Sequence, residues 1–262
     1  MKARAMPRVT PWFRRHFTSY SRWSLRRHFH SVRVLKTSLP ALDSAALRDT
    51  SLVVFLNHAS WWDPLVSLLV AEAFLPARTC FAPIAAAHLE RYRFFRHLGF
   101  YGVNERTALS FVRTTCALLD TPQHAVWVTP QGRFADVRER PLRFAPGLGA
   151  VAKLRPQAAY LPLAIDYTFW TEPQPEILIA FGTPIIPAQH GPEREWTAAF
   201  EYALAATQDT VATAAAAREP AQWQALERGA RGVNPIYDAW RWLRARWTGE
   251  RFSRAHRAEA LE

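Results

Sequence analysis

Short apolar runs alternate with helical patterns between residues 30 and 187, and this alternation constrains the fold more than any other feature of the chain. The runs that have the length and composition of buried strands lie at 31–36, 52–56, 78–81, 99–103, 125–128, 158–165 and 176–181. Helical patterns separate them at 64–75, 85–97, 107–119 and 147–154. This order predicts an α/β fold with a mixed central sheet flanked by helices.

The length of 262 residues suits one large domain with appendages. We predict a basic amphipathic N-terminal helix within 1–29, an α/β domain at 30–190 and a helical C-terminal extension at 191–262. The extension is expected to be wholly helical because its turns are rich in alanine. Cys80 and Cys116 are the only cysteines, so neither a disulfide framework nor a zinc ribbon is expected, and no metal site is predicted.

The most informative local segment joins the apolar run at 52–56 to the helix that follows it. His58 comes just after the expected strand, at the sheet edge where α/β proteins usually bind ligands. Asp63, at the start of the helix, is placed to accept a hydrogen bond from one ring nitrogen of His58. The other nitrogen then remains free to take a proton from an alcohol, which predicts a catalytic pair.

A purely structural interpretation of the same segment also stands. Aspartate followed by Pro64 is a good helix start, because Asp63 can cap the helix and proline fits its first turn. Asn57 and His58 are then turn residues. The spacing alone leaves both interpretations open.

The N-terminal segment is strongly basic and contributes much of the net charge of +11. No acidic residue precedes Asp43, whereas the basic residues before it are Lys2, Arg4, Arg8, Arg14, Arg15, Arg22, Arg26, Arg27, Arg33 and Lys36. On a helix beginning at Pro11, one face carries the aromatic side chains Trp12, Phe13, Phe17, Tyr20 and Trp23. Such a helix is typical of membrane interfaces with anionic lipids.

We therefore expect a peripheral protein on the cytoplasmic face of the cell membrane. The segment lacks the apolar core of a signal peptide, and no run of about 20 apolar residues is present to span a bilayer. A basic helix packed on the protein's own body is an alternative. Nucleic acid is not an expected partner, because no reading helix, RRM or KH pattern accompanies the charge.

Four segments, in this order, resemble the conserved blocks of the glycerolipid acyltransferases of the 1-acylglycerol-3-phosphate O-acyltransferase type. Residues 57–64, Asn-His-Ala-Ser-Trp-Trp-Asp-Pro, match the N-H-x-S-x-x-D signature and are the most specific. Residues 99–106 are similar to block two, a strand that begins with glycine and ends in arginine. Residues 128–133 stand where F-P-E-G-T-R is expected, and residues 161–164 are similar to block four.

The resemblance covers roughly residues 30–190 and implies a membrane-associated O-acyltransferase. Such enzymes transfer a fatty acyl group from acyl-CoA or acyl carrier protein to a hydroxyl of a lysophospholipid such as lysophosphatidic acid, without a cofactor. His58 is then the general base, and Asp63 orients it and stabilises its imidazolium. No G-x-S-x-G nucleophile elbow is present, so no acyl-enzyme is expected.

The resemblance also implies a set of substrate-binding residues. Asn57 and Ser60 belong to block one, and Arg106 is the candidate for gripping an acceptor phosphate with its fork of donors. Gly132 would let backbone N–H groups approach the substrate. The alternatives are that Arg106 is an ordinary surface arginine and that Gly132 only makes a turn at a strand end.

Block three departs from the family pattern. Gln131 replaces the glutamate, and Arg133-Phe134 follow Gly132 in place of Thr-Arg. An amide donates as well as accepts, so acceptor recognition by Gln131 must differ. The candidates that compete with Arg133 for the role of the block-three arginine are Arg138, Arg140 and Arg143. The departure leaves two further hypotheses: acylation of the sugar of a glycolipid or glycosylated carotenoid, or a non-catalytic lipid-binding protein of the same fold.

Overall fold

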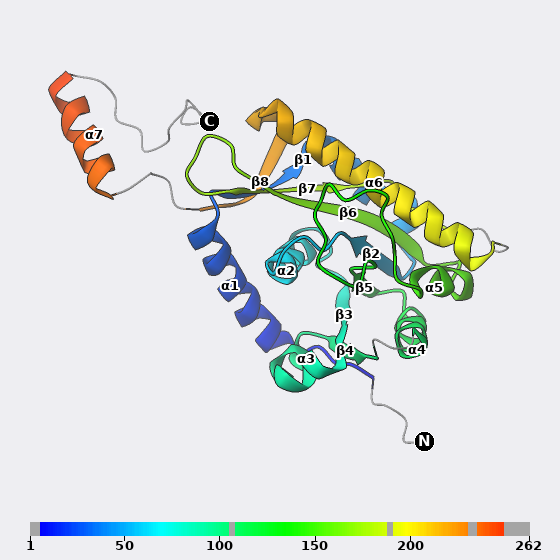
Figure 1. Cartoon of the computed structure of the whole chain (residues 1–262). Coiled ribbons are helices and arrows are strands. Elements are labelled where there is room, and N and C mark those ends of the chain that lie inside the picture. Colours follow the sequence, from blue (N-terminus) through cyan, green and yellow to red (C-terminus); the bar gives the residue numbers. More distant parts are fainter. Residues whose placement is uncertain (1–5, 105–107, 188–190, 230–234, 249–262) are drawn as a thin grey trace.

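The computed structural model describes residues 6–104, 108–187, 191–229 and 235–248, and its centre is a twisted sheet (Figure 1). Within these residues the strands are β1 (Ser31–Leu35), β2 (Leu52–Leu56), β3 (Thr79–Ala85), β4 (Phe100–Val103), β5 (His124–Val128), β6 (Ala159–Thr168), β7 (Glu176–Phe181) and β8 (Trp223–Arg228). They form one eight-stranded sheet in the order β4-β3-β5-β2-β6-β7-β1-β8.

Both pairing modes occur in the sheet. The strands β4, β3, β5, β2 and β6 all run parallel to one another, whereas β7 is antiparallel to β6. Next, β1 runs parallel to β7, and β8 is antiparallel to β1. The predicted α/β fold with a mixed central sheet is confirmed.

Helices cover both faces of this sheet (Figure 1). The α-helices are α1 (Pro11–His28), α2 (Asp63–Phe74), α3 (Ala86–Arg91), α4 (Leu109–Leu118), α5 (Leu148–Leu154), α6 (Glu193–Ala217) and α7 (Pro235–Thr248). Short 3₁₀ helices are η1 (Lys36–Asp43), η2 (Ala45–Leu47), η3 (Arg93–His97) and η4 (Pro220–Gln222). The single helix predicted over 85–97 is instead a strand end followed by α3 and η3.

The central strand β2 shows why the sequence forms this arrangement. Val54 and Leu56 pack in the core under α1 and α2, whereas Val53 and Phe55 pack in the core under α4, α5 and α6. A strand buried on both faces needs an uninterrupted apolar run, and residues 52–56 supply one. The loop that leaves β2 therefore begins from a strand that is buried on both faces.

The prediction of a wholly helical C-terminal extension is wrong for residues 223–228. These residues form β8, which pairs with β1 and completes the sheet. Trp223 and Glu227 are buried while Gln224 and Arg228 are exposed, so tertiary burial of one strand face outweighs local helix propensity. The alanine-rich helix α6 packs on β6 and β7.

Helix α1 packs on α2, and its buried residues are Thr18, Ser21, Ser24 and Leu25. Its aromatic side chains Phe13 and Phe17 contact Phe94 of η3. Trp12, Tyr20 and Trp23 are 63%, 48% and 58% exposed.

Two of the basic residues of α1 are bound to the protein itself. Arg22 and Arg26 form ion pairs with the buried Glu227 of β8 at 3.1 and 2.5 Å, and Arg22 also pairs with Glu72 of α2 at 3.0 Å. The helix thus packs on the body of the protein and still presents an aromatic surface. No helix among the described residues has both the length and the apolar character needed to cross a bilayer.

Candidate active site

His58 and Asp63 are in contact, as the sequence predicts. His58 lies just beyond β2, Asp63 is the first residue of α2, and the imidazole Nδ1 donates to the Asp63 Oδ2 at 2.7 Å. The Asp63 side chain is 2% exposed and the His58 side chain is 22% exposed. Because Nδ1 is engaged by the carboxylate, Nε2 is the ring nitrogen left to accept a proton.

Two more donors hold the buried Asp63 carboxylate. The backbone N–H of Ser60 donates to Oδ2 at 3.0 Å, and the hydroxyl of Tyr167 donates to Oδ1 at 2.6 Å. Burial and the adjacent carboxylate raise the pKa of Tyr167 well above its usual value, so the phenol keeps its proton and remains a donor. With both oxygens hydrogen-bonded, the carboxylate has a fixed orientation toward His58.

Tyr167 was not among the residues expected from the sequence. It lies 104 positions from Asp63 in the chain, and the apolar run that predicted a strand over 158–165 stops before it. The structure extends β6 to Thr168, which carries Tyr167 to the catalytic edge of the sheet. In the sequence, Tyr167 two positions after Ile165 indicates that the strand continues, because alternate residues of a strand lie on the same face.

Asn57 and Ser60, expected to bind substrate, both make hydrogen bonds within the protein. Asn57 is 1% exposed, and its amide both donates to the Ile165 carbonyl and accepts from the Ile165 N–H at 2.9 Å. Ser60 Oγ accepts from the Trp62 N–H at 3.2 Å, which closes the turn before α2. Both side chains therefore position the loop that carries His58.

The loop after β5 contains Gln131 and Gly132. Gly132 has a φ of +68°, and its N–H donates to the Thr129 carbonyl at 3.0 Å. Glycine suits this turn because of the backbone angle, and its N–H is used inside the turn rather than offered to a substrate. Gln131 is buried, and its Oε1 has no hydrogen-bond partner among the described residues.

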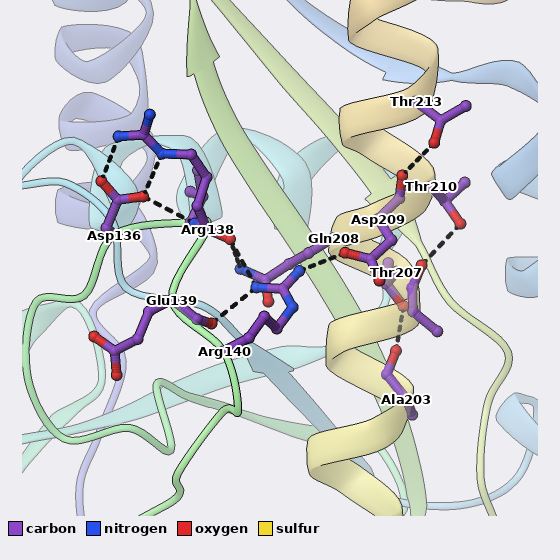
Figure 2. Close-up of polar contacts among 12 residues, drawn as sticks. Asp136, Arg138, Glu139, Arg140, Ala203, Thr207, Gln208, Asp209, Thr210 and Thr213 are labelled. Atoms are coloured by element: carbon purple, nitrogen blue, oxygen red, sulfur yellow. Dashed lines mark hydrogen bonds and ion pairs between the residues drawn. The ribbon is translucent and has the colours of Figure 1, made fainter.

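Arg133, expected to contact the acceptor, is bound to the protein itself. Its side chain is more than half exposed and is held by Glu139 and the Phe134 carbonyl. Among its competitors, Arg138 pairs with Asp136 and Arg140 pairs with Asp209, as Figure 2 shows. Arg143 is exposed, and Arg106 lies outside the described residues.

Phe134 and Ala135 connect this loop directly to His58. The Phe134 ring lies over the imidazole with a centroid separation of 4.1 Å, and the Ala135 N–H donates to the His58 carbonyl at 2.9 Å. Phe134 is otherwise exposed. One face of the imidazole is thus covered by an aromatic ring.

An apolar cavity of about 180 Å³ lies beside the pair, and His58 and Asp63 form part of its wall. Most of the remaining wall comes from α2, β3 and the start of β4, with the side chains Leu56, Leu68, Ala71, Phe81, Ala82, Ile84, Leu98, Phe100 and Trp127. This lining suits a hydrocarbon chain. The described part of the chain contains no group of three or more His, Cys, Asp or Glu side chains arranged for a metal ion.

Comparison with known proteins gives a similarity of fold. No family model matches the sequence, and no curated protein matches it. The structure is similar to the crystal structure of the 1-acyl-sn-glycerophosphate (LPA) acyltransferase PlsC from Thermotoga maritima, with a TM-score of 0.50 and 15% sequence identity. The match covers 78% of this chain and 81% of that chain.

Proposed function

We propose that this protein is an O-acyltransferase that moves a fatty acyl group from an acyl thioester to a hydroxyl of a lipid acceptor. The observation that carries the proposal is the hydrogen-bonded pair of His58 and Asp63 in the wall of an apolar cavity. The fold shared with a lysophosphatidic acid acyltransferase supports it. Acyl-CoA and acyl carrier protein both supply the required thioester, and no further cofactor is needed.

The geometry supports a direct transfer. His58 Nε2 takes the proton of the acceptor hydroxyl as that oxygen attacks the thioester carbonyl. The C–S bond then breaks, and the thiolate leaves with the proton that the imidazolium returns. Asp63 stabilises the imidazolium between these steps because its carboxylate accepts from Nδ1.

The apolar cavity is the proposed site for the acyl chain next to its carbonyl. Burial of each methylene is worth about 0.8 kcal/mol, so an apolar wall binds the donor without polar contacts. The acceptor has two candidate classes: a lysophospholipid such as lysophosphatidic acid, and the sugar of a glycolipid or glycosylated carotenoid. The ion pair of Arg133 with Glu139 supports the sugar as a candidate acceptor, because the Arg133 guanidinium is then engaged by a carboxylate rather than by an acceptor phosphate.

Thioester consumption tests this proposal. With acyl-CoA and a mixture of lysophosphatidic acid and glucosyl lipid, we expect His58→Ala to lower the rate of thiol release about 10²–10⁴-fold. His88→Ala, at an exposed position of α3, is the matched control and should retain full activity. Equal rates for His58→Ala and the parent protein would contradict the assignment. Binding of acyl-CoA without turnover of any acceptor would favour a non-catalytic lipid-binding protein.

We also propose that the protein lies on the cytoplasmic face of the cell membrane. The support is the exposed aromatic surface of α1, formed by Trp12, Tyr20 and Trp23, together with the basic residues around it. Aromatic side chains enter the interface, and lysine and arginine near anionic lipids each add about 1 kcal/mol. Leu25 of the same helix belongs to the core, so point substitutions test this better than deletion of the helix.

Flotation with phosphatidylglycerol-containing vesicles is the test of attachment. The double variant Trp12→Ala/Trp23→Ala should bind the vesicles at least about tenfold more weakly, because full burial of one large apolar side chain is worth about 1.5–3 kcal/mol. Tyr202→Ala, at an exposed position of α6, serves as the control. Unchanged flotation would refute attachment through α1. A salt-sensitive DNA shift in place of flotation would favour nucleic-acid binding.

A further inference from the structure

A second hollow, of about 780 Å³, lies beside the loop that carries His58. It is bounded by residues 136–140, by the end of β6 and by α6 (Figure 2). Ala59, next to His58, and Tyr167, the partner of Asp63, both line it. We call this hollow the polar cleft. Its volume is in the range of sites that take a small molecule or one group of a larger one.

The cations of the polar cleft are matched by carboxylates. Arg138 forms a two-point pair with Asp136 at 2.9 and 2.8 Å, and Arg140 pairs with Asp209 of α6 at 2.5 Å (Figure 2). The full set of charged lining residues is Asp136, Asp166, Asp209, Arg138, Arg140 and Arg218. The lining therefore carries no net formal charge, unlike a site built for a phosphate dianion.

Two side chains beside the cleft, Asp166 and Gln208, can accept more hydrogen bonds than the described residues donate to them. Asp166 of β6 is half-buried, and among the described residues its carboxylate accepts only from the Tyr167 N–H, at 2.8 Å. Burial raises the pKa of Asp166, and Asp136 adds to this while Arg138 opposes it.

Gln208 of α6 supplies the second acceptor. It is 5% exposed, and its Nε2 donates across to the Val137 carbonyl at 3.3 Å. Its buried Oε1 has no hydrogen-bond partner in the described part of the chain. An unmatched buried acceptor costs about 1–3 kcal/mol.

These groups distinguish between the acceptor classes. A phosphate monoester brings negative charge and further acceptor oxygens, so it would face Asp166 and the carboxylates of the two ion pairs unfavourably. A sugar hydroxyl both donates and accepts. It is able to donate to Asp166 and to accept from Arg138 without breaking the pair of that arginine with Asp136.

We propose that the polar cleft binds the head of the acceptor lipid and that this head is an uncharged polyol, such as the sugar of a glycolipid, rather than a phosphate monoester. The inference rests on the proposed acyl transfer, because it places the hydroxyls of the head beside the loop that carries His58. Asp166 is the specificity-determining residue, and it acts on the acceptor rather than on the donor.

The experiment compares two acceptors that share one acyl chain, a monoglucosyl lipid and lysophosphatidic acid, with acyl-CoA as donor in detergent micelles. We expect kcat/KM to be about tenfold or more higher for the glucosyl lipid. Asp166→Ala should lower that value about tenfold, as loss of a hydrogen bond to a charged group does, and leave the KM for acyl-CoA unchanged. Asp166→Asn, which keeps the shape, should lose less, and the exposed Asp43→Ala should lose nothing.

Two results would overturn the inference alone: a kcat/KM for lysophosphatidic acid equal to or above that for the glucosyl lipid, or equal losses for both acceptors in Asp166→Ala and in Asp166→Asn. If no thiol is released with either acceptor, the proposed acyl transfer is contradicted, and the inference with it. If thiol is released with at least one acceptor and this release requires His58, the acyl transfer is supported, and the comparison of acceptors then tests the inference separately.

Discussion

The apolar cavity and the polar cleft share one catalytic loop but differ in how they select a ligand. The cavity of about 180 Å³ is lined mainly by apolar side chains, whereas the wall of the cleft of about 780 Å³ combines apolar side chains with six charged ones. His58 and Asp63 belong to the wall of the first, and Ala59 and Tyr167 to the wall of the second. In the proposed reaction, apolar contacts would bind the acyl thioester and hydrogen bonds would bind the lipid alcohol, both next to one loop.

This difference has a consequence for specificity. An apolar wall discriminates by length, and one methylene is worth only about 0.8 kcal/mol. A wall of hydrogen-bonding groups discriminates by chemical type, because an unmatched acceptor costs free energy when the wrong head binds. We therefore expect the donor to be selected gradually by chain length and the acceptor to be selected sharply by class.

Tyr167 lines the polar cleft and donates to Asp63 in the wall of the apolar cavity, so Tyr167→Phe affects both regions. Of the three variants that compare the regions, we expect it to have the largest effect. Removal of the hydroxyl leaves Asp63 Oδ1 without its donor, and a hydrogen bond to a charged group is worth about 1.5–3 kcal/mol. The kcat should fall about 10- to 100-fold while the KM values for donor and acceptor stay the same. Tyr202→Phe, on the exposed side of α6, is the control. A change in one KM alone would assign Tyr167 to one region only.

Ala82→Leu addresses the cavity and should have an intermediate effect. The added carbons occupy space along the cavity wall, so the preferred acyl chain should become shorter, with about a fourfold loss for each methylene that no longer fits. A series of acyl-CoA chain lengths measures the shift, and the acceptor KM should not move. Ala87→Leu, at an exposed position of α3, should leave the profile as it was. An altered acceptor preference in Ala82→Leu would contradict the separation of the two regions.

Asp166→Asn addresses the cleft through stability, and its effect should be the smallest. Because burial raises the pKa of Asp166, the folded protein holds that proton more tightly than the unfolded chain. Stability is therefore lost as pH rises from the ordinary aspartate pKa of about 3.9 through the raised value. At pH 7 we expect the asparagine variant to melt higher by on the order of 1 °C.

The control for that prediction is pH itself. Below about pH 4 the Asp166 carboxyl is protonated in both states, so the two melting temperatures should converge. Asp43→Asn should show no difference at either pH, because Asp43 is exposed. Melting temperatures that differ equally at both pH values would show that Asp166 does not carry a burial cost.

The sequence predicted what is local in the chain. His58 and Asp63 are five positions apart, and the apolar run before them together with Pro64 after them fixes a strand, a turn and a helix. That local order is sufficient to place the imidazole beside the carboxylate. The strand alternation likewise predicted the mixed sheet, because buried central strands leave a strong apolar signature.

What the sequence did not predict depends on contacts between distant segments. The partners of Asp63 and Asn57 on β6, Tyr167 and Ile165, lie more than a hundred positions away. The orientation of Arg133 depends on a neighbouring acidic residue, Glu139, in a loop without periodicity. The strand at 223–228 gains its stability from pairing with β1, which no local propensity records.

The two hydrogen bonds between Asn57 and the backbone of Ile165 tie the His58 loop to the central sheet. Two residues beyond Ile165, the same strand supplies the hydroxyl that orients Asp63. The base, its carboxylate and the phenol thus keep their mutual geometry through a preorganised scaffold rather than through ligand contacts. If the protein catalyses the proposed acyl transfer, little of the free energy gained on lipid binding is consumed in arranging these groups, and it remains available for lowering the barrier.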